Sequence, residues 1–318
     1  MWRSVVALFL WITLLVPLSP AFPGATQDRN RPAAEEEFEP LYPDTEVRGL
    51  FRDLGTEQVR LEEPDPLSHT KGRRIFSQVS EPAYAIVRAE KSANSGVAVV
   101  LLPGGAFVDL WLDKEGTDIA RWLAKRGVTS MILKYSTLED GSGQEIMPWT
   151  TYQDAVKRET ARAIEVLRER SPQLGVDPGK IGMMGFSAGG AVVHWHLFDK
   201  KKDGQCCTAN TKTRPAFVGL IYGSAFRDGK ADPPLPLLDD PHDLPPIYMA
   251  AARDDGYIDF NGPHYVQFFF DVIGAVPRSE LHVYGVGGHG FALDKRGYAV
   301  STWLDGFYLW LRDLGMLP

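Results

Sequence analysis

The sequence predicts an α/β domain over residues 71–318, built on a mostly parallel eight-stranded sheet with helices on both faces. Two observations lead to this prediction. Short unbroken apolar runs, typical of strands buried on both faces, alternate along the chain with longer amphipathic stretches. The 318 residues are 44% hydrophobic and 24% charged, which is enough apolar material for a large core. Strands that alternate with helices form parallel, helix-covered sheets.

The strands and helices of this domain are predicted in turn from apolar runs and from start and stop signals. The strands are expected over residues 74–79, 84–87, 97–102, 128–135, 180–185, 216–222, 246–251 and 281–285. The helices are expected over residues 117–126, 154–170, 191–198 and 302–312. Thr117 or Asp118 should cap the first helix, Gly127 should end it, and the second helix should end before Pro172.

Two segments precede the domain. Residues 1–25 resemble a signal peptide, with an apolar run from Val5 to Leu18 behind one positive charge and small residues after it. The alternative is an uncleaved anchor, but the run is shorter than the roughly 20 residues of a spanning helix and Pro17 interrupts its end. We therefore expect a secreted or periplasmic protein without stable membrane insertion. Residues 26–70 are rich in Glu, Asp and Pro and are predicted to be a flexible, solvated lead-in.

Composition excludes several classes of function. The chain has 34 Lys and Arg against 41 Asp and Glu, a net charge of -7, so it has no basic surplus for binding nucleic acid. Cys206 and Cys207 are adjacent and lack the spacing of a zinc site, so neither a metal nor a cofactor is expected. The redox state of the two cysteines, the role of the loop over residues 198–214 and the oligomeric state stay open.

A G-x-S-x-G motif at residues 185–189 follows a predicted strand and precedes a predicted helix. In this context the serine takes a strained backbone conformation at a sharp turn, and glycines on either side prevent collisions with neighbouring backbone. The turn exposes the Ser187 hydroxyl beside the N-terminus of the helix. Ser187 is therefore the candidate nucleophile.

A serine nucleophile needs a base, for which histidine is the usual side chain. Of the seven histidines, His289 follows the last predicted strand in a glycine-lined loop, Gly287-Gly288-His289-Gly290. Ligands of parallel sheets lie at the carboxyl ends of the strands, which is where this loop begins. His289 is the preferred base, while His242 and His264 are not eliminated by position alone.

The base in turn needs a carboxylate that accepts its Nδ1 proton. The strand over residues 246–251 is followed by Asp254 and Asp255. Asp255 is preferred because Ile258 would then pack the loop down and Asp254 would serve as a turn residue. The choice between the two acids stays open. The chain order Ser, Asp, His is the one expected for this type of sheet.

Acyl transfer also needs N–H donors for the developing oxyanion. Ala188, directly after the nucleophile, supplies one. The loop after the third predicted strand reads Pro103-Gly104-Gly105-Ala106-Phe107, and its glycines allow the N–H of Gly105 or Ala106 to point inward. The predicted oxyanion hole thus consists of Gly105, Ala106 and Ala188.

Five motifs in order make the chain resemble a known family over roughly residues 74–316. They are Pro103-Gly104-Gly105-Ala106-Phe107, Glu115-Gly116, Leu133-Lys134-Tyr135, the segment 185–190 and the segment 287–291. The chain resembles secreted acetylxylan-esterase-like serine esterases of the α/β-hydrolase superfamily, related to dienelactone hydrolase. One departure is Pro103-Gly104-Gly105-Ala106, where hormone-sensitive-lipase-like relatives have His-Gly-Gly-Gly.

The resemblance implies a three-layer α/β-hydrolase fold and a serine carboxylic ester hydrolase that works through an acyl-enzyme. Its substrate class would be acetylated polysaccharide or another small acyl ester. The alternatives are a broader carboxylesterase or lipase-like activity, a peptidase, and a hydrolase-fold module that binds without turnover. Ala106 and Phe107 add bulk to the oxyanion loop, so the acyl pocket is predicted to be small and to prefer acetyl esters.

Overall fold

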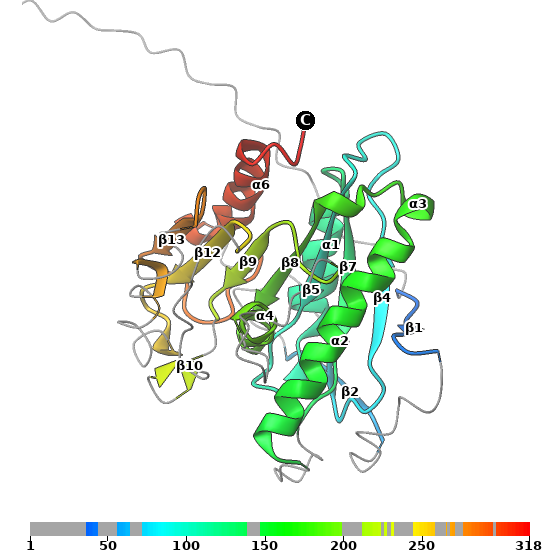
Figure 1. Ribbon diagram of the computed structural model, residues 1–318. Helices are drawn as coiled ribbons and strands as arrows, with labels where there is room; N and C mark the ends of the chain where they lie inside the picture. The colour runs from blue at the N-terminus through cyan, green and yellow to red at the C-terminus, as the bar shows by residue number, and fades with distance from the viewer. Residues whose placement is uncertain are drawn as a thin grey trace, which may run out of the picture. The chain divides into compact units, whose positions relative to one another are not determined.

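The protein is described here from a computed structural model. The structure describes residues 36–43, 56–63, 72–138, 147–198, 212–223, 226–227, 230–231, 244–257, 265, 268–270, 276–294 and 297–318. Its centre is an eight-stranded sheet of order β1-β4-β7-β5-β8-β9-β12-β13 (Figure 1). These strands are β1 Glu39–Pro40, β4 Ala83–Val87, β5 Val97–Leu102, β7 Val128–Lys134, β8 Ile181–Phe186, β9 Val218–Ile221, β12 Ile247–Ala252 and β13 Glu280–Tyr284. Neighbours from β7 to β13 are parallel, whereas β1–β4 and β4–β7 are antiparallel.

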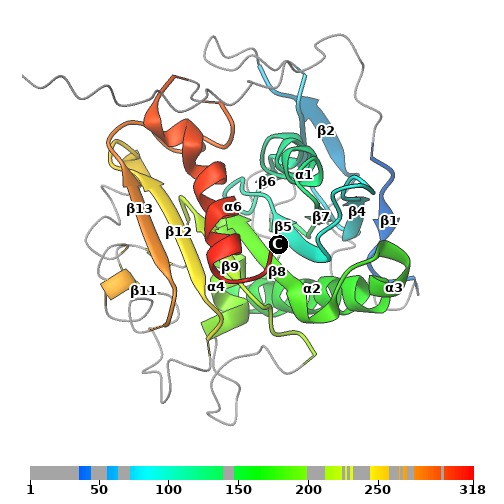
Figure 2. The ribbon, with the colours of Figure 1, turned by 90° about the horizontal axis from the view of Figure 1, so that it is seen from above.

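Helices cover both faces of this sheet. The α-helices are α1 Asp118–Ala124, α2 Trp149–Glu169, α3 Ser171–Leu174, α4 Ala188–Phe198 and α6 Trp303–Asp313. In Figure 2, α1 and α6 lie on one face, and α2 and α4 lie on the other. All residues of β5, β7, β8 and β12 are buried, as expected for unbroken apolar runs between two helix layers. The predicted mostly parallel, helix-covered sheet is therefore confirmed.

Shorter elements complete the described chain. A three-stranded sheet contains β2 Gln58–Leu61, β3 Arg74–Ser77 and β6 Asp109–Leu110, and β10 Phe226–Arg227 pairs with β11 Lys230–Ala231. A π-helix, η2 Asp113–Thr117, precedes α1, and 3-10 turns lie at η3 Pro178–Lys180 and η6 Ala299–Thr302.

Some details of the predicted elements were wrong, including two helix starts: α2 begins at Trp149 rather than at residue 154, and α4 begins at Ala188 rather than at residue 191. Residues 74–79 were counted as a strand of the main sheet, but β3 pairs with β2 and β6 instead, and β1 makes up the eighth strand. Gln78, with φ +55°, ends the extended run, and the N–H of Val79 donates to Thr137 Oγ1 at 2.9 Å. Neither Thr117 nor Asp118 caps α1, because both have helical angles where η2 continues into α1.

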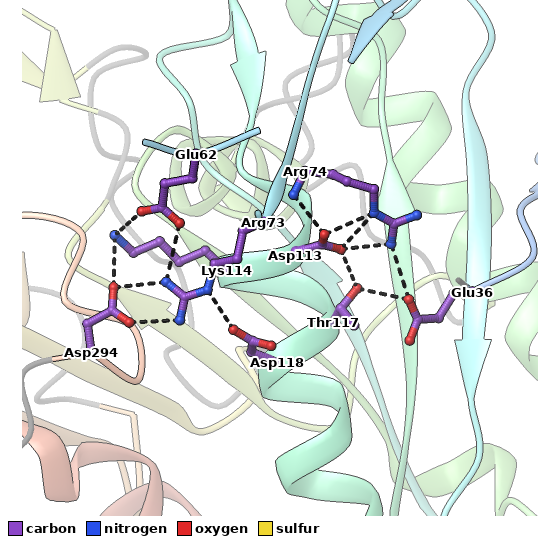
Figure 3. Close-up of polar contacts among 9 residues, drawn as sticks. All are labelled: Glu36, Glu62, Arg73, Arg74, Asp113, Lys114, Thr117, Asp118 and Asp294. Atoms are coloured by element: carbon purple, nitrogen blue, oxygen red, sulfur yellow. Dashed lines mark hydrogen bonds and ion pairs between the residues drawn. The ribbon is translucent and has the colours of Figure 1, made fainter. Parts of the chain in front are cut away.

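The lead-in was also predicted to be flexible, and this prediction is wrong for residues 36–43 and 56–63. In β1 the backbone pairs with β4, and Leu41 is buried. Glu36 binds both Arg74 and Arg121 at 3.2 and 2.6 Å, and Figure 3 shows Arg74 held in turn by Asp113. These acidic residues were interpreted as solvated because their cationic partners lie far away in the sequence.

The described helices include none that is both long and apolar enough to cross a bilayer. The predicted signal peptide over residues 1–25 lies outside the described residues, as do most of the lead-in, Cys206 and Cys207. Their predictions are not changed by the structure.

Candidate active site

Ser187 lies at the tight turn between β8 and α4. Its φ of +49° is in the left-handed region, which costs a non-glycine residue on the order of 1–3 kcal/mol. A β-carbon on Gly185 would lie 2.3 Å from the carbonyl oxygen of Gly189, and one on Gly189 would lie 2.0 Å from that of Leu102. The two flanking positions of the motif therefore exclude any side chain, and the end of β5 packs directly against the N-terminus of α4.

The structure brings Ser187, His289 and Asp255 together at the carboxyl end of the sheet. Ser187 Oγ lies 2.8 Å from His289 Nε2, and His289 Nδ1 lies 2.9 Å from Asp255 Oδ2. Asp255 is fully buried, whereas 26% of the His289 side chain is exposed. A buried carboxylate on Nδ1 favours the tautomer whose Nε2 accepts the serine proton. The geometry is thus suited to activating the Ser187 hydroxyl.

Both acids after β12 contact the loop of His289, but only Asp255 contacts its ring. Asp254 Oδ1 accepts the N–H groups of Gly287 and Gly288 at 2.8 and 2.7 Å. The other oxygen of Asp255 accepts the N–H of Tyr257 at 2.9 Å. Asp254 therefore anchors the loop backbone, which is more than the turn role expected from the sequence.

The predicted oxyanion loop lies directly against the nucleophile. A β-carbon on Gly104 would lie 2.7 Å from Ser187 Cβ, so only glycine allows this approach. Gly105 and Ala106 have φ of +138° and +55°. No described residue accepts a hydrogen bond from the backbone N–H of Gly105, Ala106 or Ala188. These three donors are consequently available to a bound group.

A buried ion cluster holds the chain just after His289. The Arg73 guanidinium, 6% exposed, donates to both oxygens of Asp294 at 2.7 and 3.0 Å and to Asp118 at 2.8 Å (Figure 3). Lys114 and Glu62 complete the cluster. Burial raises the pKa of Asp118 to about 6, despite the opposing charge of Arg73. For Asp294 the effect of burial is outweighed by Arg73, and its pKa is lowered.

The other described histidines lie away from Ser187 in contacts of their own. Burial lowers the pKa of His194 and His196 in α4 to about 3 and about 4, so both are neutral at neutral pH. His282 in β13 pairs with Glu280 at 2.8 Å. His242 and His264 lie outside the described residues.

Aromatic side chains surround the site. The rings of Tyr222 and Tyr257 lie 5.3 and 4.5 Å from the His289 ring, centroid to centroid. Phe107 stacks on Trp195 at 5.3 Å and meets Trp149 edge-on at 5.1 Å. The sequence predicted the bulk of Phe107 but neither tyrosine. The signal for Tyr222 was its position at the carboxyl end of a predicted strand.

The described residues contain no group of three or more His, Cys, Asp or Glu side chains suited to a metal ion.

Comparison with known proteins agrees with the fold. No protein-family model matches the chain. An acetylxylan esterase from Xylanibacter ruminicola is 24% identical over 245 residues, 70% of this chain and 45% of that protein, so the match spans less than half of that relative. An acetyl ester-xyloside bifunctional hydrolase from Caldicellulosiruptor lactoaceticus has a TM-score of 0.59 at 19% identity, covering 89% of this chain and 98% of that one.

An α/β-hydrolase enzyme from a Medee basin deep-sea metagenome library has a TM-score of 0.56 at 21% identity, covering 81% of this chain and 98% of that one. The fold is therefore the α/β-hydrolase fold that the resemblance implied.

Proposed function

We propose that this chain is a serine hydrolase of carboxylic esters that works through an acyl-enzyme on Ser187. The observation that carries the proposal is the hydrogen-bonded series from Ser187 through His289 to the buried Asp255. It is strengthened by the similarity to an acetylxylan esterase and to an acetyl ester-xyloside hydrolase.

The proposed reaction has two halves. His289 Nε2 takes the proton of the Ser187 hydroxyl as the oxygen attacks the ester carbonyl carbon. Asp255 keeps the proton on Nδ1 and stabilises the imidazolium, without itself being protonated. The collapsing intermediate expels the alcohol, which receives the proton from Nε2. Water then attacks the acyl-enzyme with His289 as base, and the acid and the free serine are released.

The oxyanion of both intermediates would be bound by the N–H groups of Ala188 and of the loop residues Gly105 and Ala106. Each such donor contributes roughly 3 kcal/mol to stabilising the transition state, since removal of one costs about 10²- to 10³-fold in kcat. The close contact of Gly104 with Ser187 supports this assignment.

An acetyl ester of a carbohydrate is the proposed substrate. The two names above point to acetylated xylan and xylosides. The fixed aromatic contacts of Phe107 with Trp195 and Trp149 add a rigid wall next to the oxyanion loop. An over-long acyl chain in a closed pocket is penalised sterically by about 1–3 kcal/mol. We expect acetyl esters to exceed butyryl and octanoyl esters in kcat/KM, and a rising series would instead favour a lipase-like carboxylesterase.

Export through the predicted signal peptide over residues 1–25 belongs to the same proposal, because a polysaccharide substrate lies outside the cell. The mass of the protein recovered from the medium or periplasm of an expressing cell would give the cleavage point. Recovery only of the full-length chain inside the cell would contradict it.

The decisive experiment compares Ser187→Ala with the wild type on nitrophenyl acetate, acetylated xylan and peptide amides. Loss of the nucleophile should lower kcat by on the order of a million-fold and abolish labelling by a fluorophosphonate probe. Ser95→Ala is the control, since the Ser95 hydroxyl donates to the carbonyl of Gly127 where β5 and β7 begin, at the opposite ends of the strands from Ser187. Wild-type protein that binds these substrates without turnover would identify a binding module, and faster cleavage of amides would identify a peptidase.

A further inference from the structure

Glu115 is a buried carboxylate that the proposed mechanism does not use. It lies in the π-helix η2, 4% exposed. Its Oε2 accepts the N–H of Gly104 at 2.6 Å, and its Oε1 accepts the hydroxyl of Tyr222 at 2.8 Å. π-Helical turns are rare and often occur at functional sites. The two partners of Glu115 belong to opposite sides of the candidate active site.

On one side, Glu115 holds the oxyanion loop. Gly104 approaches Ser187 closely, and a β-carbon on it would lie 3.0 Å from Glu115 Oε2. The carbonyl of Gly104 also accepts the N–H of Trp111 at 3.0 Å, so its backbone is bound at both ends. The next two residues have positive φ, and such a strained turn persists only where its surroundings hold it. Because both backbone groups of Gly104 are hydrogen-bonded, Gly104 holds the position of the next two residues, whose N–H groups are the predicted oxyanion donors.

On the other side, Glu115 holds the aromatic residue against the base. Tyr222 follows β9 with a strained φ of +40°, and its ring meets those of His289 and Phe291 at 5.3 and 4.5 Å. A β-carbon on the next residue, Gly223, would lie 2.1 Å from the carbonyl oxygen of Ser187. The hydroxyl of Tyr222 thus connects Glu115 to a residue whose ring contacts His289 and whose neighbour, Gly223, packs against the backbone of Ser187.

The surroundings of Glu115 disfavour its charged form. Burial raises the pKa of Glu115, and the two hydrogen bonds and the charges of Lys114 and His289 offset this only in part. A buried charge is costly to desolvate, whereas a glutamine at this position could hydrogen-bond to the same two partners. The proposed role of Glu115 therefore rests on its two hydrogen bonds and not on its charge.

We propose that Glu115, together with Tyr222, is a positioning residue for ester hydrolysis, fixing the oxyanion loop through Gly104 and the packing of His289 through the Tyr222 ring. The inference rests on the proposed function. Glu115 touches neither Ser187 nor His289 by a hydrogen bond and acts through these two neighbours.

The test is steady-state kinetics on nitrophenyl acetate with three variants. Glu115→Ala removes both hydrogen bonds and should lower kcat about 100-fold, the range found when an oxyanion donor is lost, with KM changed less than about threefold. Tyr222→Phe keeps the ring, removes the hydrogen bond to Glu115 and should lower kcat about tenfold. Glu115→Gln still accepts the Gly104 N–H and can donate to the Tyr222 oxygen, so it should recover kcat to within about fivefold of the wild type.

A stability control separates positioning from folding. Asp113→Asn disturbs the same π-helix, but its carboxylate binds Arg74 at 2.7 to 3.2 Å. It should lower the unfolding temperature and leave kcat within about twofold. If Glu115→Ala does not fold, the loss of kcat in folded Tyr222→Phe still tests the proposal.

Three outcomes have distinct meanings. Unchanged kcat in both Glu115→Ala and Tyr222→Phe, or a kcat that only follows the folded fraction, overturns the positioning role and leaves the proposed function intact. A rise in KM alone also overturns it. A wild type that is neither labelled on Ser187 nor active on any ester removes both proposals.

Discussion

Replacing Arg73 by methionine should destabilise the fold strongly, because the guanidinium is buried among three carboxylates. Asp294 is 3% exposed, Glu62 9% and Asp118 22%, and Arg73 lies within 2.7 to 3.4 Å of all three (Figure 3). Removing one partner of a buried ion pair costs about 3–5 kcal/mol, since a buried charge is left uncompensated. Lys114, 3.2 Å from Asp294, remains as a cation, which favours the lower end, about 3 kcal/mol.

The measurement is urea-induced unfolding at pH 7, with Arg60→Met as the matched control. Arg60 pairs with Asp109, but its side chain is 53% exposed. An exposed pair contributes about 0–1 kcal/mol, so the control should lose less than 1 kcal/mol. If Arg73→Met loses no more stability than the control, the burial of Arg73 among the carboxylates in Figure 3 does not stabilise the fold.

The pH dependence gives a second test of the same cluster. The pKa of Asp294 is lowered in the folded protein from its usual 3.8, with burial opposing and Arg73 favouring ionisation. The stabilisation is therefore present above the unfolded pKa and is lost as the pH falls through the folded one. The difference between wild type and Arg73→Met should shrink below about pH 4. A difference that grows on acidification would contradict the assignment to Asp294.

Three further predictions concern single side chains. Asp255→Asn should lower kcat about 10⁴-fold through loss of the correct tautomer, whereas Asp254→Asn should act mainly on stability; the reverse order of kcat would exchange their roles. Burial raises the pKa of Glu159 from 4.5 to about 7, so folding stability should fall as the pH rises through this range, by at most about 3 kcal/mol. Glu159→Gln should flatten that slope in pH-dependent thermal unfolding, and an unchanged slope would exclude Glu159 as its source. Gly104→Ala should cost about 1–3 kcal/mol and reduce kcat, because the added methyl would lie 2.7 Å from Ser187 Cβ; wild-type kinetics would show that the loop can move away.

The strands that the sequence predicted well are those whose pattern is local. Strand β5 has the predicted bounds, and the predicted ends of β7 and β8 lie within one residue of those observed. Each is an unbroken apolar run buried between two layers of helices, so burial alone determines the pattern. The motif around Ser187 is also recognisable locally, although only Gly185 is required by a contact within the turn, whereas Gly189 is required by its contact with Leu102 of β5.

Pairing between distant segments was not predictable in this way. The two residues of β1 are too few to show a pattern, and the four residues of β2 are all exposed, so no buried apolar face marks either strand in the sequence. Both are attached by backbone pairing and by side-chain contacts with distant residues, such as Glu39 with Arg170. The Arg73–Asp294 pair joins positions 221 residues apart. The burial of a charged side chain can be predicted only when its partner of opposite charge is known, and here the partners are distant in the sequence. The π-helix η2 is likewise a departure from the helical pattern that no composition signal marks.

The order of the strands explains both the Ser–His–Asp geometry and the place of Tyr222 next to it. Strand β9 lies between β8 and β12, so the ends of the two strands that Ser187 and Asp255 follow are two strand spacings apart, about 10 Å. One imidazole with a hydrogen bond at each end nearly spans that gap, which is why a single histidine from the loop after β13 can join the two. A residue at the end of β9 therefore lies between the strand ends that carry Ser187 and Asp255. Tyr222 occupies that position, and its bond to Glu115 follows from the same sheet order that assembles the site.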